Sequence, residues 1–90
     1  MEDNLEFKTL RNEGFIRNKM TILELIRKLK EVTHVIVMYD DNDVILDFWS
    51  SDYFEELLYP QDNEIIENTG VHSFEFKDGI LAIYVECIFS

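Results

Sequence analysis

The chain has 90 residues, which is enough for one small domain and too few for two. Its 8 Lys and Arg residues stand against 19 Asp and Glu residues, so the formal net charge is −11 and a duplex-binding protein is excluded. Hydrophobic residues make up 47% of the chain, far more than disordered acidic tails contain. The composition therefore indicates a folded, soluble domain.

The cysteine content and the lengths of the apolar runs point to a compartment. Cys87 is the only cysteine, so no intrachain disulfide can form, which is typical of a reducing environment. No apolar run approaches the roughly 18 residues of a membrane span, and residues 1–19 show no export signal. We expect a cytoplasmic protein.

The first 19 residues have no clear periodicity. Their apolar side chains match neither a helix nor a strand for long, so a strand, an arm and partial disorder are the alternatives. Met20 directly precedes a clear helix signal. The predicted organisation is an N-terminal extension over residues 1–19 and a single domain over residues 20–90.

The first helix is predicted over Thr21–Glu31. Thr21 and Glu24 have the spacing of a capping box, in which each side chain binds the other residue's backbone N–H. The following apolar residues have helical spacing and form one stripe: Ile22, Leu25, Ile26 and Leu29.

A β-hairpin follows, with its turn at residues 40–43. The β-branched and aromatic runs 35–39 and 44–49 flank an Asp- and Asn-rich segment. A loop of two or of four residues gives the same predicted core face, made of Val35, Val37, Tyr39, Val44, Leu46 and Phe48. His34 precedes this hairpin and His72 the next one, at strand beginnings where histidine is usually a surface or edge residue.

The second helix is predicted over Asp52–Tyr59. Pro60 is expected to end it, because the residue before a proline is pushed out of the helical region. Residues 61–71 are expected to form a loop that contains a helical turn or a short strand, anchored by Ile65 and Ile66.

A second hairpin closes the domain, with Asp78 and Gly79 as a two-residue type I′ turn. This turn pairs Phe76 with Leu81 and Phe74 with Ile83, and it places Glu75 opposite Ala82 and Ser73 opposite Tyr84. The predicted fold is α+β: a four-stranded, mainly antiparallel sheet of two hairpins with two short helices, in the order α-β-β-α-β-β.

The outward face of this sheet is too apolar to be simply solvated. Its residues alternate out of phase with the core set: Ile36, Met38, Ile45, Trp49, Ile80, Ala82 and Tyr84. Either the N-terminal extension or the second helix covers it, or it is an exposed interface of the kind that forms homodimers.

The chain lacks the spacings that catalysis or metal binding requires. The Asp40–Asp43 run does not match a calcium loop, and neither histidine has a nucleophile–base spacing with Cys87, which is expected on the buried side of its strand. Adjacent carboxylates such as Glu55 and Glu56 point apart on a helix, and no glycine-rich phosphate loop is present. We expect no enzyme activity, no metal and no cofactor.

The negative charge lies in the C-terminal two-thirds of the chain, where residues 32–90 hold 13 acidic residues and Lys77 as the only Lys or Arg. This charge either keeps a small apolar-rich protein in solution or binds a basic partner.

The helix of Met20–Lys30, the acidic turn Asp40–Asp43 and the closing hairpin around Phe74–Gly79 together resemble small acidic proteins of phages and mobile elements of Gram-positive bacteria, of the anti-CRISPR kind. The resemblance implies a viral, non-catalytic inhibitor that mimics DNA. Such a protein acts in the host bacterial cytoplasm and occupies the basic channel of an RNA-guided nuclease.

Two other classes fit the sequence: an immunity or antitoxin protein against a basic nuclease toxin, and a homodimeric structural or regulatory module that uses the apolar outer face. For the inhibitor we expect a basic nucleic-acid-binding protein as partner, without direct contact to nucleic acid or membrane. The predicted contact residues are nine carboxylates in the turn, the second helix and the following loop: Asp40, Asp41, Asp43, Asp52, Glu55, Glu56, Asp62, Glu64 and Glu67.

Overall fold

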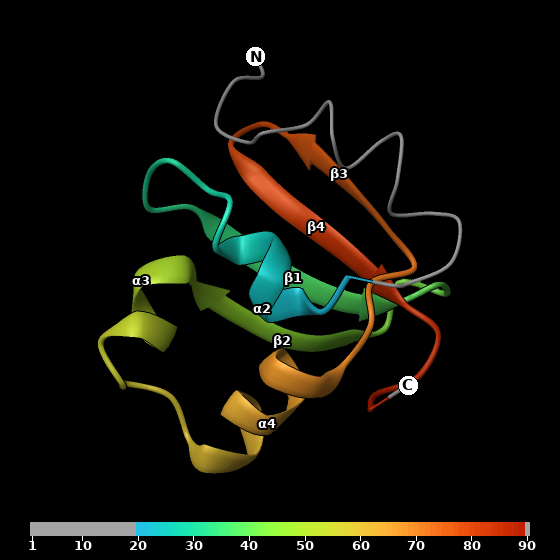
Figure 1. Cartoon of the computed structure of the whole chain (residues 1–90). Coiled ribbons are helices and arrows are strands. Elements are labelled where there is room, and N and C mark those ends of the chain that lie inside the picture. Colours follow the sequence, from blue (N-terminus) through green and yellow to red (C-terminus); the bar gives the residue numbers. More distant parts are fainter. Residues whose placement is uncertain (1–19, 90) are drawn as a thin grey trace.

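The structure is a computed structural model that describes residues 20–89. Its sheet has the strand order β2-β1-β4-β3, with β1 (His34–Tyr39), β2 (Val44–Trp49), β3 (Ser73–Lys77) and β4 (Ile80–Val85). Its helices are α2 (Ile22–Ile26), α3 (Ser50–Phe54) and α4 (Pro60–Asn68) (Figure 1). The predicted α+β class and the two hairpins are confirmed, and the described order α-β-β-α-α-β-β contains one helix more than predicted.

The two hairpins meet through a parallel pair of strands. β1 pairs with β4 in parallel, from His34 opposite Ile80 to Tyr39 opposite Val85, whereas β1–β2 and β3–β4 are antiparallel. The sheet is therefore mixed, and the connection from β2 back to β3 contains both α3 and α4.

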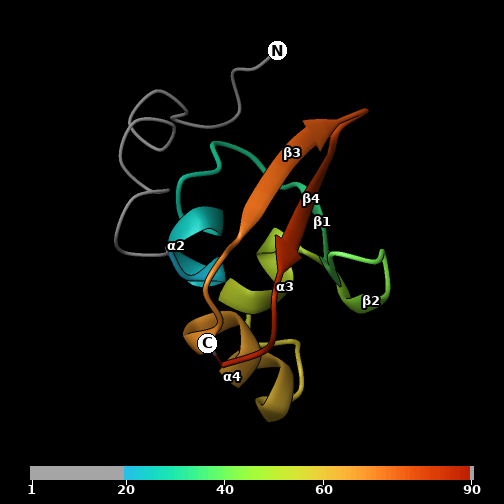
Figure 2. The same ribbon diagram turned by 90° about the vertical axis from the view of Figure 1, so that its right-hand side faces the viewer.

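The hydrophobic core lies between one face of the sheet and two of the helices. Figure 2 shows α2 and α4 on the same side of the sheet. Ile66 of α4 is fully buried, as are the α2 residues Ile22 and Leu25. The sheet contributes the alternating inward residues of its strands: Val35, Val37, Leu46, Phe48, Leu81, Ile83 and Val85.

Helix α2 begins as predicted but ends earlier. The capping box is present: the Thr21 hydroxyl accepts a hydrogen bond from Glu24 N at 3.1 Å, and the Glu24 carboxylate accepts one from Thr21 N at 2.9 Å. The predicted end at Glu31 is wrong. After Ile26 the backbone N–H groups of Lys28 and Leu29 bond three residues back, which tightens the last turn before the chain enters β1.

The β3–β4 hairpin has the predicted register at every pair that was named. Asp78 and Gly79 have φ values of 55° and 79°, as a type I′ turn requires. The β1–β2 hairpin departs from prediction at Val44 and at Ile45, which was expected on the outer face but packs against the core. A bulge after Val37 pairs Val44 with Met38, a residue of the outer face, so Val44 is exposed instead of contributing to the core.

The predicted helix Asp52–Tyr59 is wrong in its bounds. Helix α3 ends at Phe54 because Glu56 adopts a left-handed conformation with φ 61°. Pro60 does not stop a helix but begins α4 at a position where its missing N–H would have no helical partner. The segment 61–71, which was expected to be mostly loop, is largely this helix.

Cys87 is exposed, which corrects the prediction that it is buried. The strand ends at Val85, so the alternation that placed Cys87 on the inner face stops before reaching it. Within residues 20–89 no helix is long and apolar enough to cross a membrane. The predicted extension, residues 1–19, lies outside the described residues.

The outer face of the sheet is only partly covered in the described part. Ile36, Met38, Ile80 and Tyr84 are half-buried. Trp49 directly precedes α3 and keeps 51% of its surface exposed. Helix α3, which corresponds to the predicted second helix, therefore does not cover the outer face at Trp49.

Candidate protein-binding surface

The nine carboxylates predicted as contacts fall into two groups, one in the β1–β2 turn and one in the segment that follows β2. Asp40, Asp41 and Asp43 are exposed in the β1–β2 turn, where the Asp41 carboxylate accepts a hydrogen bond from Asp43 N at 3.1 Å. The other six follow β2, whose six residues span roughly 17–20 Å. In Figure 1 the turn lies at the right of the sheet and α3 at the left.

The second group belongs to residues 49–67, which we call the α3–α4 segment. It contains six acidic residues and no Lys, Arg or His: Asp52, Glu55, Glu56, Asp62, Glu64 and Glu67. Four of these are exposed, whereas Asp52 and Asp62 are half-buried in the first turns of α3 and α4. Acidic residues at these positions stabilise the positive ends of the helix dipoles.

Large apolar side chains are exposed between these carboxylates. Of the seven large hydrophobic residues that are exposed in the described part, Trp49, Phe54, Leu57 and Tyr59 all lie in the α3–α4 segment. Leu57 is 66% and Tyr59 71% exposed. Aromatic and aliphatic side chains that a small domain leaves in water next to charged groups are typical of protein interfaces.

A Schellman motif explains why Leu57 points into solvent. Leu57 N donates to the carbonyl of Asp52 at 2.9 Å, and Glu56 N donates to that of Tyr53 at 3.1 Å. This geometry requires the left-handed conformation of Glu56 and ends the helix before Leu57 can join its buried face.

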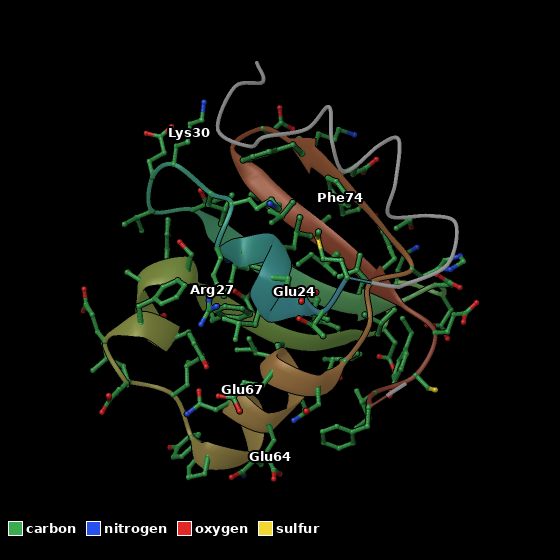
Figure 3. The ribbon with its side chains drawn as sticks, viewed as in Figure 1. Glu24, Arg27, Lys30, Glu64, Glu67 and Phe74 are labelled. Carbon is green, nitrogen blue, oxygen red and sulfur yellow. The ribbon has the colours of Figure 1, made fainter. Side chains whose placement is uncertain are left out.

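The two helices of the segment are joined by a side-chain hydrogen bond. The hydroxyl of Tyr53 in α3 donates to the carboxylate of Glu67 in α4 at 2.6 Å. This hydrogen bond, together with partial burial and the nearby negative charge, raises the pKa of Tyr53, whereas Arg27 acts in the opposite direction. Figure 3 shows Arg27, which directly follows α2, above Glu67, with Glu64 farther out on α4.

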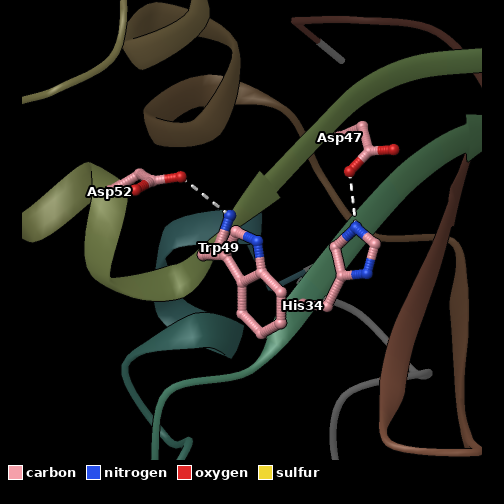
Figure 4. A network of polar contacts seen from close by, with 4 residues as sticks. All are labelled: His34, Asp47, Trp49 and Asp52. Carbon is pink, nitrogen blue, oxygen red and sulfur yellow. Dashed lines mark hydrogen bonds and ion pairs between the residues drawn. The ribbon is translucent and has the colours of Figure 1, made fainter.

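A second polar network holds Trp49 at the start of the segment (Figure 4). The imidazole of His34 stacks on the indole with ring centroids 5.0 Å apart and an interplanar angle of 19°. Nε2 of His34 lies 2.5 Å from a carboxylate oxygen of Asp47, and the Asp52 carboxylate accepts a hydrogen bond from Trp49 N at 3.0 Å. His34 thus covers one face of the indole, and Asp52 holds the backbone of Trp49.

The two histidines each lie near a single carboxylate, His34 near Asp47 and His72 near Glu86. Among residues 20–89 no three His, Cys, Asp or Glu side chains are grouped so that they could hold a metal ion. Nδ1 of His72 lies 3.4 Å from a carboxylate oxygen of Glu86, the residue that follows β4.

Comparisons of the chain with known protein families, with curated proteins and with solved structures found no match. The sequence patterns predicted the carboxylates of the α3–α4 segment as contacts but not the exposure of Phe54, Leu57 and Tyr59. One signal was present: Leu57, Leu58 and Tyr59 are consecutive, and three consecutive apolar residues cannot all face one core.

Proposed function

We propose that this protein is a non-catalytic inhibitor that occupies a basic, nucleic-acid-binding surface of a partner protein through its α3–α4 segment. The observation that carries the proposal is the exposed Phe54, Leu57 and Tyr59 among six carboxylates. Acidic residues that only solubilise a protein do not need large apolar side chains between them. Binding energy at interfaces comes mainly from such apolar and aromatic anchors, while charge governs encounter and choice of partner.

The charge of the segment defines the class of partner. Six negative charges without a basic residue favour a surface rich in Arg and Lys, which is the surface that binds phosphates in nucleases. An RNA-guided nuclease is the partner that the resemblance implies, and a basic nuclease toxin is the alternative within the same chemistry.

A pull-down from a bacterial lysate tests the proposal. The tagged protein is compared with two matched double variants, Glu55→Gln/Glu56→Gln in the α3–α4 segment and Asp40→Asn/Asp41→Asn in the turn, each of which removes two charges. The proposal predicts that the unchanged protein and the turn variant capture a basic protein, that salt releases it, and that the segment variant loses it.

The proposal fails if the two variants capture equal amounts of the basic protein, or if high salt does not release that protein. Recovery of nothing beyond the protein itself would instead favour the homodimeric module. The half-buried apolar residues Ile36, Met38 and Tyr84 of the outer sheet face would then be the contact.

A further inference from the structure

Trp49 has the features of a preformed recognition element. It is the only tryptophan of the chain, it ends β2, and about half of its surface is exposed. Tryptophan is among the residues that contribute most to binding at interfaces, because a large rigid ring loses little conformational entropy when it binds.

The orientation of this ring is set before any partner arrives. His34 is the cross-strand partner of Trp49, and its imidazole covers one side of the indole. His34 is in turn held by Asp47, so it cannot turn away without losing this contact. A ring that is already ordered avoids part of the cost of immobilisation during binding.

The charges around the ring are negative. Asp47 precedes Trp49 by two residues on the same face of β2, and its side chain remains 59% exposed although one oxygen contacts His34. The Asp52 carboxylate lies within hydrogen-bonding distance of the backbone of Trp49. In Figure 4 the second oxygen of Asp47 points away from the imidazole.

We infer that the exposed part of Trp49 binds an arginine side chain of the partner protein, with Asp47 and Asp52 supplying the negative field. A guanidinium group is planar, stacks on an indole and pairs with carboxylates, whereas a lysine ammonium group offers only its charge. A nucleobase could also stack on the ring, but its phosphates would meet a protein of net charge −11. This inference rests on the proposed function and names the side chain that is recognised.

Fluorescence titration tests the inference, because Trp49 is the sole source of indole emission. The probes are capped hexa-arginine and hexa-lysine peptides of equal charge and a single-stranded thymidine hexanucleotide. We expect hexa-arginine to change the emission and to bind roughly three- to tenfold more tightly than hexa-lysine. The hexanucleotide should not bind.

Two matched variants test whether hexa-arginine binds next to Trp49. Asp47→Asn keeps an oxygen for His34 and removes one charge, and Glu75→Gln removes one charge on β3, the strand farthest from β2 on the same sheet. We expect Asp47→Asn to weaken hexa-arginine binding roughly three- to tenfold and Glu75→Gln to change it less than about twofold. Calorimetry with Trp49→Leu should show equal affinity for both peptides.

Equal binding of the two peptides with unchanged emission would overturn the arginine assignment and leave the proposed function standing. Equal effects of Asp47→Asn and Glu75→Gln would overturn it as well, and so would binding of the hexanucleotide. If neither peptide binds and the pull-down also recovers no basic protein, the proposed function itself fails.

Discussion

Glu56 adopts a left-handed backbone conformation that is uncommon for its residue type. The left-handed conformations of Asn42 and Asp78 suit short polar side chains that tolerate this region, but glutamate has no such preference. Glycine is the usual residue at this position of a Schellman motif. Sequence patterns could not have predicted the end of α3, because nothing in the residue type of Glu56 indicates a left-handed turn.

Replacing Glu56 with glycine should separate stability from binding. Glu56→Gly relieves the steric cost of the left-handed conformation, so we expect the free energy of unfolding to rise by about 0.5–1 kcal/mol. Binding to the basic partner should weaken, because an exposed carboxylate is lost from the α3–α4 segment.

Urea unfolding and a binding titration on the same sample measure the two effects. Glu55→Gln is the control, since it removes a neighbouring charge without changing the backbone, and its stability should stay within about 0.5 kcal/mol of the unchanged protein. A less stable Glu56→Gly protein would mean that the Glu56 side chain makes a stabilising contact.

The helices are too short to be stable alone and depend on contacts with the rest of the fold. Helix α3 has five residues and α4 nine, below the length at which an isolated helix persists in water. Ile66 anchors α4 in the core, and the hydrogen bond from Tyr53 to Glu67 connects α3 to it. The geometry of the candidate surface therefore depends on this hydrogen bond.

High pH should weaken this connection. Glu67 raises the pKa of Tyr53 above its ordinary value of 10.0 by accepting the phenol's hydrogen bond, so the folded state favours the neutral phenol. The resulting stability is complete below about pH 10 and is lost as the pH rises through the folded-state pKa. We expect the stability difference between the unchanged protein and Tyr53→Phe to shrink as the pH rises above about 10.

Urea unfolding at several pH values checks this expectation. Glu67→Gln is a useful second variant, because an amide oxygen still accepts the hydrogen bond while the negative charge is gone, and its pH dependence should be weaker. A stability difference that does not shrink above about pH 10 would show that Glu67 does not raise the pKa of the Tyr53 phenol.

Local patterns predicted the hairpins better than the helices. Alternation and the Asp78–Gly79 turn determined the register of β3 and β4, because both signals act between residues close in sequence. The parallel pairing of β1 with β4 joins residues about 46 positions apart, and no local signal specifies it. The position of Pro60 was also ambiguous, because proline can either follow a helix or begin one.

At the scale of the whole molecule, the topology separates the predicted contact carboxylates of the turn from those that follow β2. The chain reverses at residues 40–43, so β2 carries the next acidic residues to the opposite end of the sheet. Seven of the nine predicted carboxylates are exposed as expected, whereas Asp52 and Asp62 are half-buried, and the sequence could not show that the turn and the α3–α4 segment lie apart. Four of the seven large hydrophobic residues exposed within residues 20–89 lie in the segment, whereas Val44 alone adjoins the acidic turn, which is why we assign binding to the segment.

Zero-length cross-linking of the protein to the basic partner that it captures tests this assignment most directly. A carbodiimide joins carboxylates to lysines in contact, and mass spectrometry identifies the linked residues. Our account predicts links from Glu55, Glu56 and Glu64, and few from Asp40, Asp41 and Asp43. Links concentrated in the turn, with none from the α3–α4 segment, would contradict it.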